Sequence, residues 1–292
     1  MFQILHKSLS TGIVTTSYPK APAHPSSNCR GRPEIDFAAW KDARPAAAVC
    51  PTGAISYNDG DQTRIACLDL GKCIFCGLCA DADPAIHMTN DCELAASRKA
   101  DLQTTATYQL NAESRHDRLL GLSPSNTKHE SVPSLPPGQA RTDGCLKQTG
   151  NELKTRINEI LGRSLHIREV DAGSCNGCEI EIVGLNSPIY DIERFGIHFV
   201  ASPRHADMLL VTGPVSRNME LALKKTYDAM PAPRLVVAVG ACGCSGGIFG
   251  QTYASLGGVD KVLPVDVYIP GCPPNPHALL HGILTAIGQL KR

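Results

Sequence analysis

The chain has 292 residues, and its 28 Lys and Arg balance 28 Asp and Glu to give a formal net charge of zero. At ~150 residues per domain, this length suits about two domains. Charged residues make up 19% of the chain and aromatic residues 5%, which excludes an acidic disordered chain and a basic nucleic-acid-binding protein. No stretch reaches the ~18 apolar residues of a membrane-spanning helix, and the N-terminus lacks the apolar core of a secretory signal. We therefore expect a cytoplasmic protein with no transmembrane helix of its own and no nucleic-acid partner.

The chain contains 13 cysteines. Disulfides are rare in a reducing cytoplasm, and an odd number of cysteines, many of them in CxxC-type spacing, is better explained by metal ligation. We therefore expect the cysteines to carry the function of the chain.

The N-terminal part, residues 1–110, is rich in Pro, Ala and Cys and has short hydrophobic pieces between turn signals, which predicts a small domain without long helices. At its start, four apolar residues share one face of a predicted helix that we expect to dock on a partner subunit: Phe2, Leu5, Leu9 and Ile13. Residues 111–150 are dominated by Ser, Pro, Gly and charge, which predicts a linker. A strap laid over a partner subunit is the alternative for this segment.

The C-terminal part, residues 151–292, alternates predicted strands and helices. A helix is expected from Asn151 to the stop at Gly162. Short apolar runs of the buried parallel type follow at 165–170, 198–201, 208–212, 235–239 and 265–269, with helices at 216–230 and 276–289. This pattern predicts a doubly wound, flavodoxin-like α/β domain, in which ligands gather outside the carboxyl ends of the strands.

Three cysteines in the run CIFCGLC, at residues 73–79, can wrap a cubane so that each sulfur binds a different iron. Two-cluster bacterial ferredoxins use the run CxxCxxCxxxCP, in which the fourth cysteine binds the other cluster. Counting back by this spacing from the Cys50-Pro51 pair gives three residues that cannot bind iron: Trp40, Ala43 and Ala46. The fourth position after Cys79 is Asp83.

One run has thus kept only its fourth ligand, and the other has kept only its first three. The survivors are the complete set for one 4Fe-4S cluster and are called the first quartet: Cys50, Cys73, Cys76 and Cys79. A zinc knuckle and a loop of free thiols are the alternatives. We expect side chains to fill the cavity of the lost cluster, with Trp40 as a natural plug, and we do not expect Asp83 to bind metal.

A second set of cysteines follows three of the predicted strands. It is called the second quartet: Cys175, Cys178, Cys242 and Cys272. Because the loops after parallel strands converge at one edge of the sheet, four thiolates there can hold another cubane. Glycines flank each of them and let the backbone approach the inorganic sulfides.

The sequences GSCNGCEIEI at 173–182, VGACGCSGGIFG at 239–250 and IPGCPPNP at 269–276 resemble the small subunits of nickel-iron hydrogenases. The resemblance is to the energy-converting (group 4) hydrogenases of the formate hydrogenlyase subunit 7 type, which are homologous to the 20 kDa (B) subunit of NADH:quinone oxidoreductase. Residues 1–110, including TGIVTTSYP and RGRPEID, resemble the ferredoxin-like subunit 6 of formate hydrogenlyase. The chain thus resembles a fusion of two neighbouring subunits.

The resemblance implies that the second quartet binds a 4Fe-4S cluster facing a nickel-iron large subunit. The chain would then carry two 4Fe-4S clusters, relay electrons without an active site of its own, and join the inner face of the cell membrane through membrane-embedded partners. Glu179 and Glu181, beside the cluster motif, are candidates for a proton path in this family and would do nothing as surface helix residues.

Quinone-reducing relatives usually carry two adjacent cysteines in the first motif, whereas Asn176-Gly177 separates them here, which favours the hydrogenase interpretation. A quinone oxidoreductase subunit and a non-redox zinc scaffold remain the alternatives. The remaining cysteines complete no ligand spacing and are expected to be small buried residues or linker thiols: Cys29, Cys67, Cys92, Cys145 and Cys244.

Overall fold

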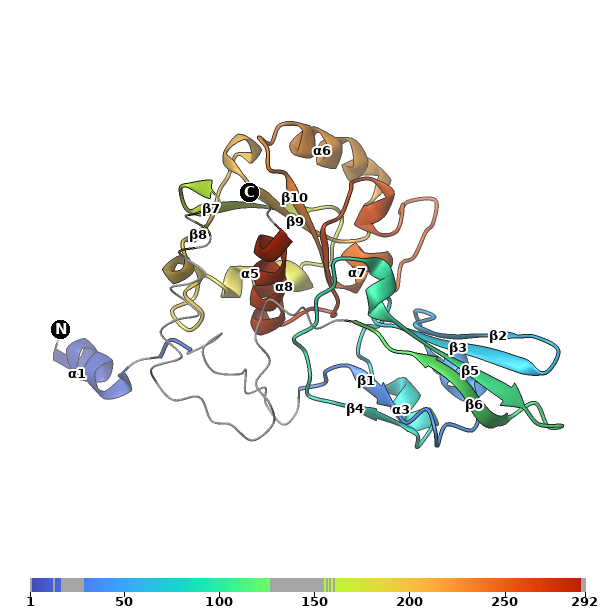
Figure 1. Ribbon diagram of the computed structural model, residues 1–292. Helices are drawn as coiled ribbons and strands as arrows, with labels where there is room; N and C mark the ends of the chain where they lie inside the picture. The colour runs from blue at the N-terminus through green and yellow to red at the C-terminus, as the bar shows by residue number, and fades with distance from the viewer. Residues whose placement is uncertain are drawn as a thin grey trace.

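The computed structural model describes residues 2–12, 14–16, 29–126, 155, 157, 159 and 161–289 (Figure 1). The helix expected from Asn151 and the predicted linker beyond residue 126 lie largely outside these residues. In the described parts of the chain, no helix is both long and apolar enough to cross a membrane.

The N-terminal unit is built from two βαβ halves. The first half contains β1 (Pro33–Ile35), α2 (Ala43–Val49) and β2 (Ile55–Asp59), and the second contains β3 (Thr63–Asp69), α3 (Leu78–Ala82) and β4 (Ile86–Met88). Strand β1 pairs antiparallel with β4, and β2 pairs antiparallel with β3. This is the duplicated arrangement that the cysteine runs indicate, and the C-cap residue is Cys50 in α2 and Asp83 in α3.

The sheet of this unit extends further than the sequence predicts. A short 3₁₀ helix, η1 (Lys99–Leu102), leads into β5 (Gln103–Leu110), and β6 (His116–Ser123) completes a four-stranded sheet in the order β2-β3-β5-β6. Strand β6 therefore occupies part of the range 111–150 that was expected to be a linker. It is an edge strand with mostly exposed side chains, so it lacks the apolar alternation that marks a strand.

The C-terminal unit contains a five-stranded parallel sheet in the order β8-β7-β9-β10-β11. The strands are β7 (Leu165–Asp171), β8 (Ile197–Phe199), β9 (Met208–Thr212), β10 (Leu235–Val239) and β11 (Val267–Ile269). In chain order this is 2-1-3-4-5, the flavodoxin-like arrangement. The predicted doubly wound fold is confirmed.

Helices cover both faces of this sheet, as Figure 1 shows. On one face, α5 (Gly177–Gly184) and α8 (Pro276–Gln289) pack on side chains such as Ile167 and Val237. On the other face, α6 (Arg217–Asp228) and α7 (Gly240–Ser245) pack on the alternate residues, such as Val211 and Val236. The alternation of buried side chains to opposite faces explains why these strands are apolar throughout.

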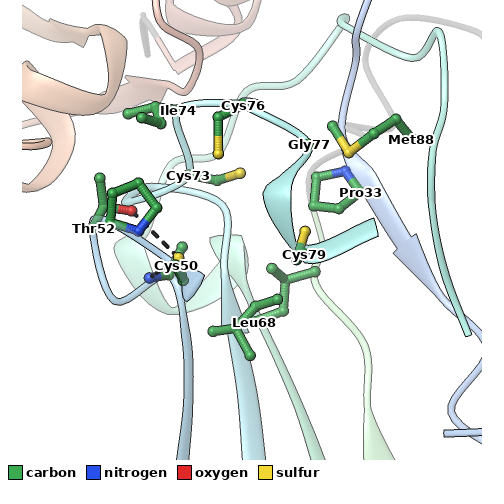
Figure 2. Close-up of a pocket in the computed structure, with 13 residues that line it drawn as sticks. Pro33, Cys50, Thr52, Leu68, Cys73, Ile74, Cys76, Gly77, Cys79 and Met88 are labelled. Atoms are coloured by element: carbon green, nitrogen blue, oxygen red, sulfur yellow. Dashed lines mark hydrogen bonds between the residues drawn. The ribbon is translucent and has the colours of Figure 1, made fainter. Parts of the chain in front are cut away.

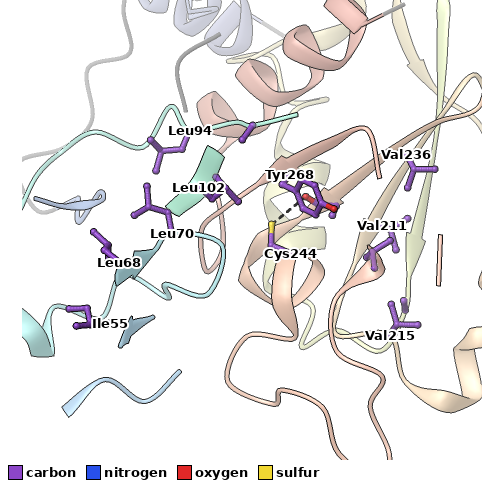
Figure 3. Close-up of a cluster of buried hydrophobic side chains, with 14 of the residues drawn as sticks. Ile55, Leu68, Leu70, Leu94, Leu102, Val211, Val215, Val236, Cys244 and Tyr268 are labelled. Carbon is purple, nitrogen blue, oxygen red and sulfur yellow. Dashed lines mark hydrogen bonds between the residues drawn. The ribbon is translucent and has the colours of Figure 1, made fainter. Parts of the chain in front are cut away.

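The two units share one hydrophobic core (Figure 3). Leu70, Leu94 and Leu102 of the N-terminal unit lie on one side of it, and Cys244 and Tyr268 of the C-terminal unit lie on the other. The side chains of all five are at least 93% buried.

Polar contacts reinforce this interface. Ala96 and Tyr268 exchange two backbone hydrogen bonds, of 3.0 and 2.8 Å. Lys99 Nζ lies 3.1 Å from Asp260 Oδ2. The interface thus fixes the relative position of the two units.

The N-terminal helix α1 (Phe2–Thr11) has the predicted helical structure and projects from the body of the molecule in Figure 1. The segment after it contacts the C-terminal unit, where Thr16 N donates to Ile189 O at 2.7 Å. Of the predicted apolar stripe, Leu9 is 77% exposed, and the other three side chains lie outside the described part of the chain. A docking role for this helix stays a prediction.

Candidate metal centres

The first quartet lies in a single pocket, shown in Figure 2. Cys50 follows α2, Cys73 and Cys76 lie in the loop after β3, and Cys79 lies in α3. The rest of the pocket is mainly apolar, with lining residues that include Pro33, Ile55, Leu68, Ile74 and Met88. The structure therefore brings together four thiols that are spread along the chain from Cys50 to Cys79.

Backbone amides point at these sulfurs. Ala54 N donates to Cys50 Sγ at 3.2 Å, and Phe75 N donates to Cys73 Sγ at 3.4 Å. The loop turns tightly around the site, because Phe75 and Gly77 have positive φ angles of 55° and 86°. Backbone amides that donate to cysteine sulfurs are common around iron-sulfur clusters and tune their reduction potential. The donor set and its surroundings therefore fit a 4Fe-4S cluster.

The pKa values of the first quartet reflect this mixture of burial and amide donors. Burial raises the pKa of Cys73 to about 12. Burial would also raise the pKa of Cys50, but hydrogen bonds from the backbone at Ile55, Thr52 and Ala54 outweigh it and lower the pKa below the usual value. These amide donors thus make the Cys50 thiol easier to deprotonate, as metal binding requires.

Side chains fill the region where a two-cluster ferredoxin would bind its other cluster, as expected. Trp40 is 1% exposed, and Trp40 Nε1 donates to Asp83 Oδ2 at 3.1 Å. Asp83 Oδ1 accepts from Ala85 N at 2.9 Å, so both carboxylate oxygens are engaged. His116 closes the site, with its ring stacked 3.8 Å from Tyr108 and its Nδ1 3.0 Å from Trp40 O.

The second quartet lies at the carboxyl edge of the parallel sheet. Cys175 lies in the loop after β7, Cys178 in the first turn of α5, Cys242 in α7, and Cys272 in the loop after β11. Burial, followed by the charges of Cys272 and Cys175, raises the pKa of Cys242 to about 11. Cys178 also has a raised pKa, from burial first and then from Glu179 and the other three cysteines. The four thiols therefore interact electrostatically with one another.

Two glycines leave room for these sulfurs. A Cβ on Gly240 would lie 2.8 Å from Cys178 Sγ, and a Cβ on Gly247 would lie 2.8 Å from Cys242 Sγ. Both glycines also have positive φ angles, of 78° and 55°, which other residues adopt only at a cost. Any side chain at these two positions would fill the space beside the sulfurs. The glycines therefore leave the room that a cluster needs when it lies close to the backbone.

The two candidate acids differ in their surroundings. Both carboxylate oxygens of Glu179 are buried without a hydrogen-bond partner, whereas Glu181 is half-buried and has a pKa raised by burial. The carboxylate oxygens of Glu179 are therefore shielded from solvent, although the residue as a whole is half-buried like Glu181.

Sequence reasoning missed a third acid, Glu169, on β7. Burial first, and then the charge of Glu179, raises the pKa of Glu169. Nothing in the sequence around Glu169 marks it, since it lies inside an apolar strand and meets Glu179 only through the fold.

Comparison with known proteins identifies the family of the C-terminal unit. The model of the family described as "NADH ubiquinone oxidoreductase, 20 Kd subunit" matches residues 175–286, a range that contains the whole second quartet. The probable membrane-bound hydrogenase subunit mbhJ of Pyrococcus furiosus is 46% identical over 143 residues, which are 48% of this chain and 86% of that relative. The chain belongs to the 20 kDa subunit family.

Within the 20 kDa subunit family, formate hydrogenlyase subunit 7 of Escherichia coli (strain K12) is 50% identical over 140 residues, 48% of this chain and 55% of that relative. The B subunit of the NADH-quinone oxidoreductase of Citrifermentans bemidjiense is 52% identical over 107 residues, 37% of this chain and 62% of the relative. The chain thus spans little more than half of these two family members.

Among solved structures, one chain of the membrane-bound sulfane sulfur reductase, an archaeal respiratory membrane complex, is similar to this protein. The match covers 49% of this chain and 76% of that chain. The two chains are 36% identical in sequence, and their structures superpose with a TM-score of 0.40.

Proposed function

We propose that the chain is an electron-transfer subunit of a membrane-associated nickel-iron hydrogenase complex of the formate hydrogenlyase type. The observation that carries this proposal is the gathering of eight thiols into two separate quartets, one of them inside the segment that defines the family. Two 4Fe-4S clusters bound there would supply one-electron chemistry. The chain itself would hold and space them and would contain no complete active site.

The interface between the two units supports a relay. A Cβ on Gly71 would lie 3.7 Å from the Cβ of Cys244. Gly71 lies two residues before Cys73, and Cys244 lies two residues after Cys242. The backbones that carry the two quartets thus meet in a packed, buried contact, which would keep the two clusters at a fixed separation.

Exposed apolar side chains around the second quartet support a partner on that side. Ile180 and Val183 on α5 are 63% and 69% exposed, and Tyr253, in the loop after α7, is 92% exposed. Exposed apolar side chains are a feature of surfaces that bind another protein. We assign this surface to the nickel-iron large subunit, with membrane-embedded subunits holding the assembly at the inner face of the cell membrane.

Glu179 is the better placed of the two candidate acids for moving protons. Its buried, unpartnered carboxylate interacts electrostatically with Cys178 and with Glu169. This buried position beside the second quartet is the reason for assigning the candidate proton path to Glu179 rather than to Glu181.

A quinone oxidoreductase subunit is the second candidate, favoured by the 52% identity to the B subunit of such an enzyme. The Asn176-Gly177 spacing and the longer match to the hydrogenase relatives, 140 residues against 107, favour the first candidate. A zinc scaffold needs four ligands around one ion. It remains the third candidate, and metal analysis of the purified chain distinguishes it from both redox candidates.

The test is the composition of the natural complex. The tagged chain is purified with its partners, without air, from solubilised membranes. The nickel content of the complex is measured, together with its hydrogen-dependent and quinone-dependent activities. The proposal expects a nickel-containing large subunit and hydrogen oxidation or evolution with artificial redox dyes. A nickel-free complex that reduces quinone would replace it with the second candidate, and a chain that binds zinc without iron would exclude both.

A further inference from the structure

Two cysteines outside both quartets face one another. Cys29 Sγ and Cys92 Sγ lie 3.4 Å apart, although 63 residues separate them in the chain. Both side chains are half-buried, so small molecules can reach them. Neither thiol has a ligand spacing in the sequence, and neither belongs to the pocket of the first quartet.

The backbone holds these two thiols opposite each other. Gly31 N donates to Thr89 O at 2.6 Å, and Arg32 N donates to Asp91 O at 2.9 Å. A Cβ on Gly31 would collide with the backbone of Asp91, so the two segments can lie this close only with glycine at that position. These contacts continue the β1–β4 pairing and restrict how far Cys29 can move from Cys92.

The same segment contacts the first quartet. Arg30 follows Cys29 directly, and its Nη1 donates to the carbonyl oxygen of Cys76 at 2.6 Å. Whatever restrains Cys29 therefore also restrains the guanidinium group that holds the loop of the first quartet.

We propose that Cys29 and Cys92 form a reversible thiol-disulfide couple that fastens Arg30 to the loop of the first quartet when the thiols are oxidised. The oxidant is a low-molecular-weight disulfide such as glutathione disulfide. The Cys29 thiolate attacks it and forms a mixed disulfide, releasing one glutathione thiol. The Cys92 sulfur then attacks Cys29, closes the protein disulfide and releases the second thiol, so two protein thiols are oxidised and one small disulfide is reduced.

The test uses the full-length, cluster-loaded chain kept without air. The chain is equilibrated with mixtures of reduced and oxidised glutathione, quenched with acid, alkylated and cleaved before aspartate. Cleavage there places Cys29 as the only cysteine in 1–35 and Cys92 as the only cysteine in 91–100. We expect one linked peptide pair, lighter by two hydrogen atoms, that rises with the oxidised fraction along a single two-electron curve and disappears with dithiothreitol.

Two variants complete the experiment. Cys29→Ser should abolish the linked pair, and Cys67→Ala, which changes a half-buried cysteine of β3, should leave it unchanged. Oxidation of the wild-type chain should slow the loss of visible iron-sulfur absorbance to an iron chelator about twofold or more, since Arg30 stays on the loop, and should have no such effect on Cys29→Ser. Separate glutathione adducts without a link, or links that include cysteines of either quartet, would overturn the proposal. If Cys29→Ser does not fold, the wild-type titration and its reversal decide the question alone.

Discussion

Trp40 and Asp83, 43 residues apart in the chain, are joined by a hydrogen bond of 3.1 Å from the indole nitrogen to the carboxylate. Trp40 stands where the upstream ferredoxin run would have its first cysteine, and Asp83 stands where the downstream run would have its fourth. In a two-cluster ferredoxin these two positions bind the same cluster, whereas here their side chains are hydrogen-bonded to each other. The burial of Trp40, with aromatic contacts to Phe37, Tyr108 and His116, supplies the core that the cluster would have supplied.

This pairing makes Asp83 a structural residue. We expect Asp83→Ala to keep its full iron content and to lower the free energy of unfolding by about 1–3 kcal/mol, because it leaves the buried indole N–H of Trp40 without a partner. Chemical denaturation and iron counts measure both effects. Asp81→Ala, on the exposed side of the same helix, is the matched control and should change neither. Loss of iron in Asp83→Ala would mean that this carboxylate binds metal.

The glycine cradle of the second quartet gives a prediction with a close control. Gly247→Ala places a methyl group 2.8 Å from Cys242 Sγ, so we expect the iron content to fall from about eight to about four per chain. Gly250→Ala introduces the same methyl at a similar φ of 58° but into open space. We expect this variant to lose about 1–2 kcal/mol of stability through backbone strain and to keep all its iron. Equal iron in the two variants would show that the cradle does not shape a cluster site.

Cys242 and Cys244 lie two residues apart and should behave differently. Cys242 belongs to the second quartet, whereas Cys244 is fully buried against Gly71 and its thiol donates to Ala238 O at 3.8 Å. We expect Cys242→Ala to lose about four irons. Cys244→Ala should retain them and lose about 1–2 kcal/mol of stability, because it truncates a packed side chain. The opposite pattern of iron loss would exchange the two assignments.

The buried carboxylate of Glu179 gives a kinetic prediction. In the purified complex, Glu179→Gln should slow hydrogen turnover by about 10²-fold, the usual scale for losing a positioned proton carrier. Iron content and the reduced-cluster spectrum should stay unchanged. Glu181→Gln, two residues along the same helix and without the same buried oxygens, is the control and should stay near wild-type rate. Equal effects of the two changes would remove Glu179 from the proton path.

Sequence pattern predicted the parallel sheet closely. The expected ranges 208–212, 235–239 and 276–289 coincide with β9, β10 and α8, because fully buried strands and a core-facing helix are marked by continuous or periodic apolar residues. The apolar pattern did not predict β5 and β6. Strand β5 buries Thr104 and Ala106 with Tyr108, a weak signal, and β6 is an exposed edge.

The two quartets were predictable because thiol spacing and strand ends are visible along the chain. The relationships that depend on folding were not. Cys29 and Cys92 are 63 residues apart and share no motif. Glu169 becomes notable only when β7 and α5 bring it near Glu179. Contacts of this kind arise from packing between elements, which local sequence does not encode.

The most direct test of two clusters on this chain is a count of iron and acid-labile sulfide, with Mössbauer and electron paramagnetic resonance spectra, on three proteins purified without air: the wild-type chain, Cys76→Ala and Cys178→Ala. We expect about eight irons and eight sulfides in the wild type and about four of each in either variant, with a different set of cubane signals missing from each. A wild-type chain with four irons or none, or the loss of the same signals from both variants, would contradict it.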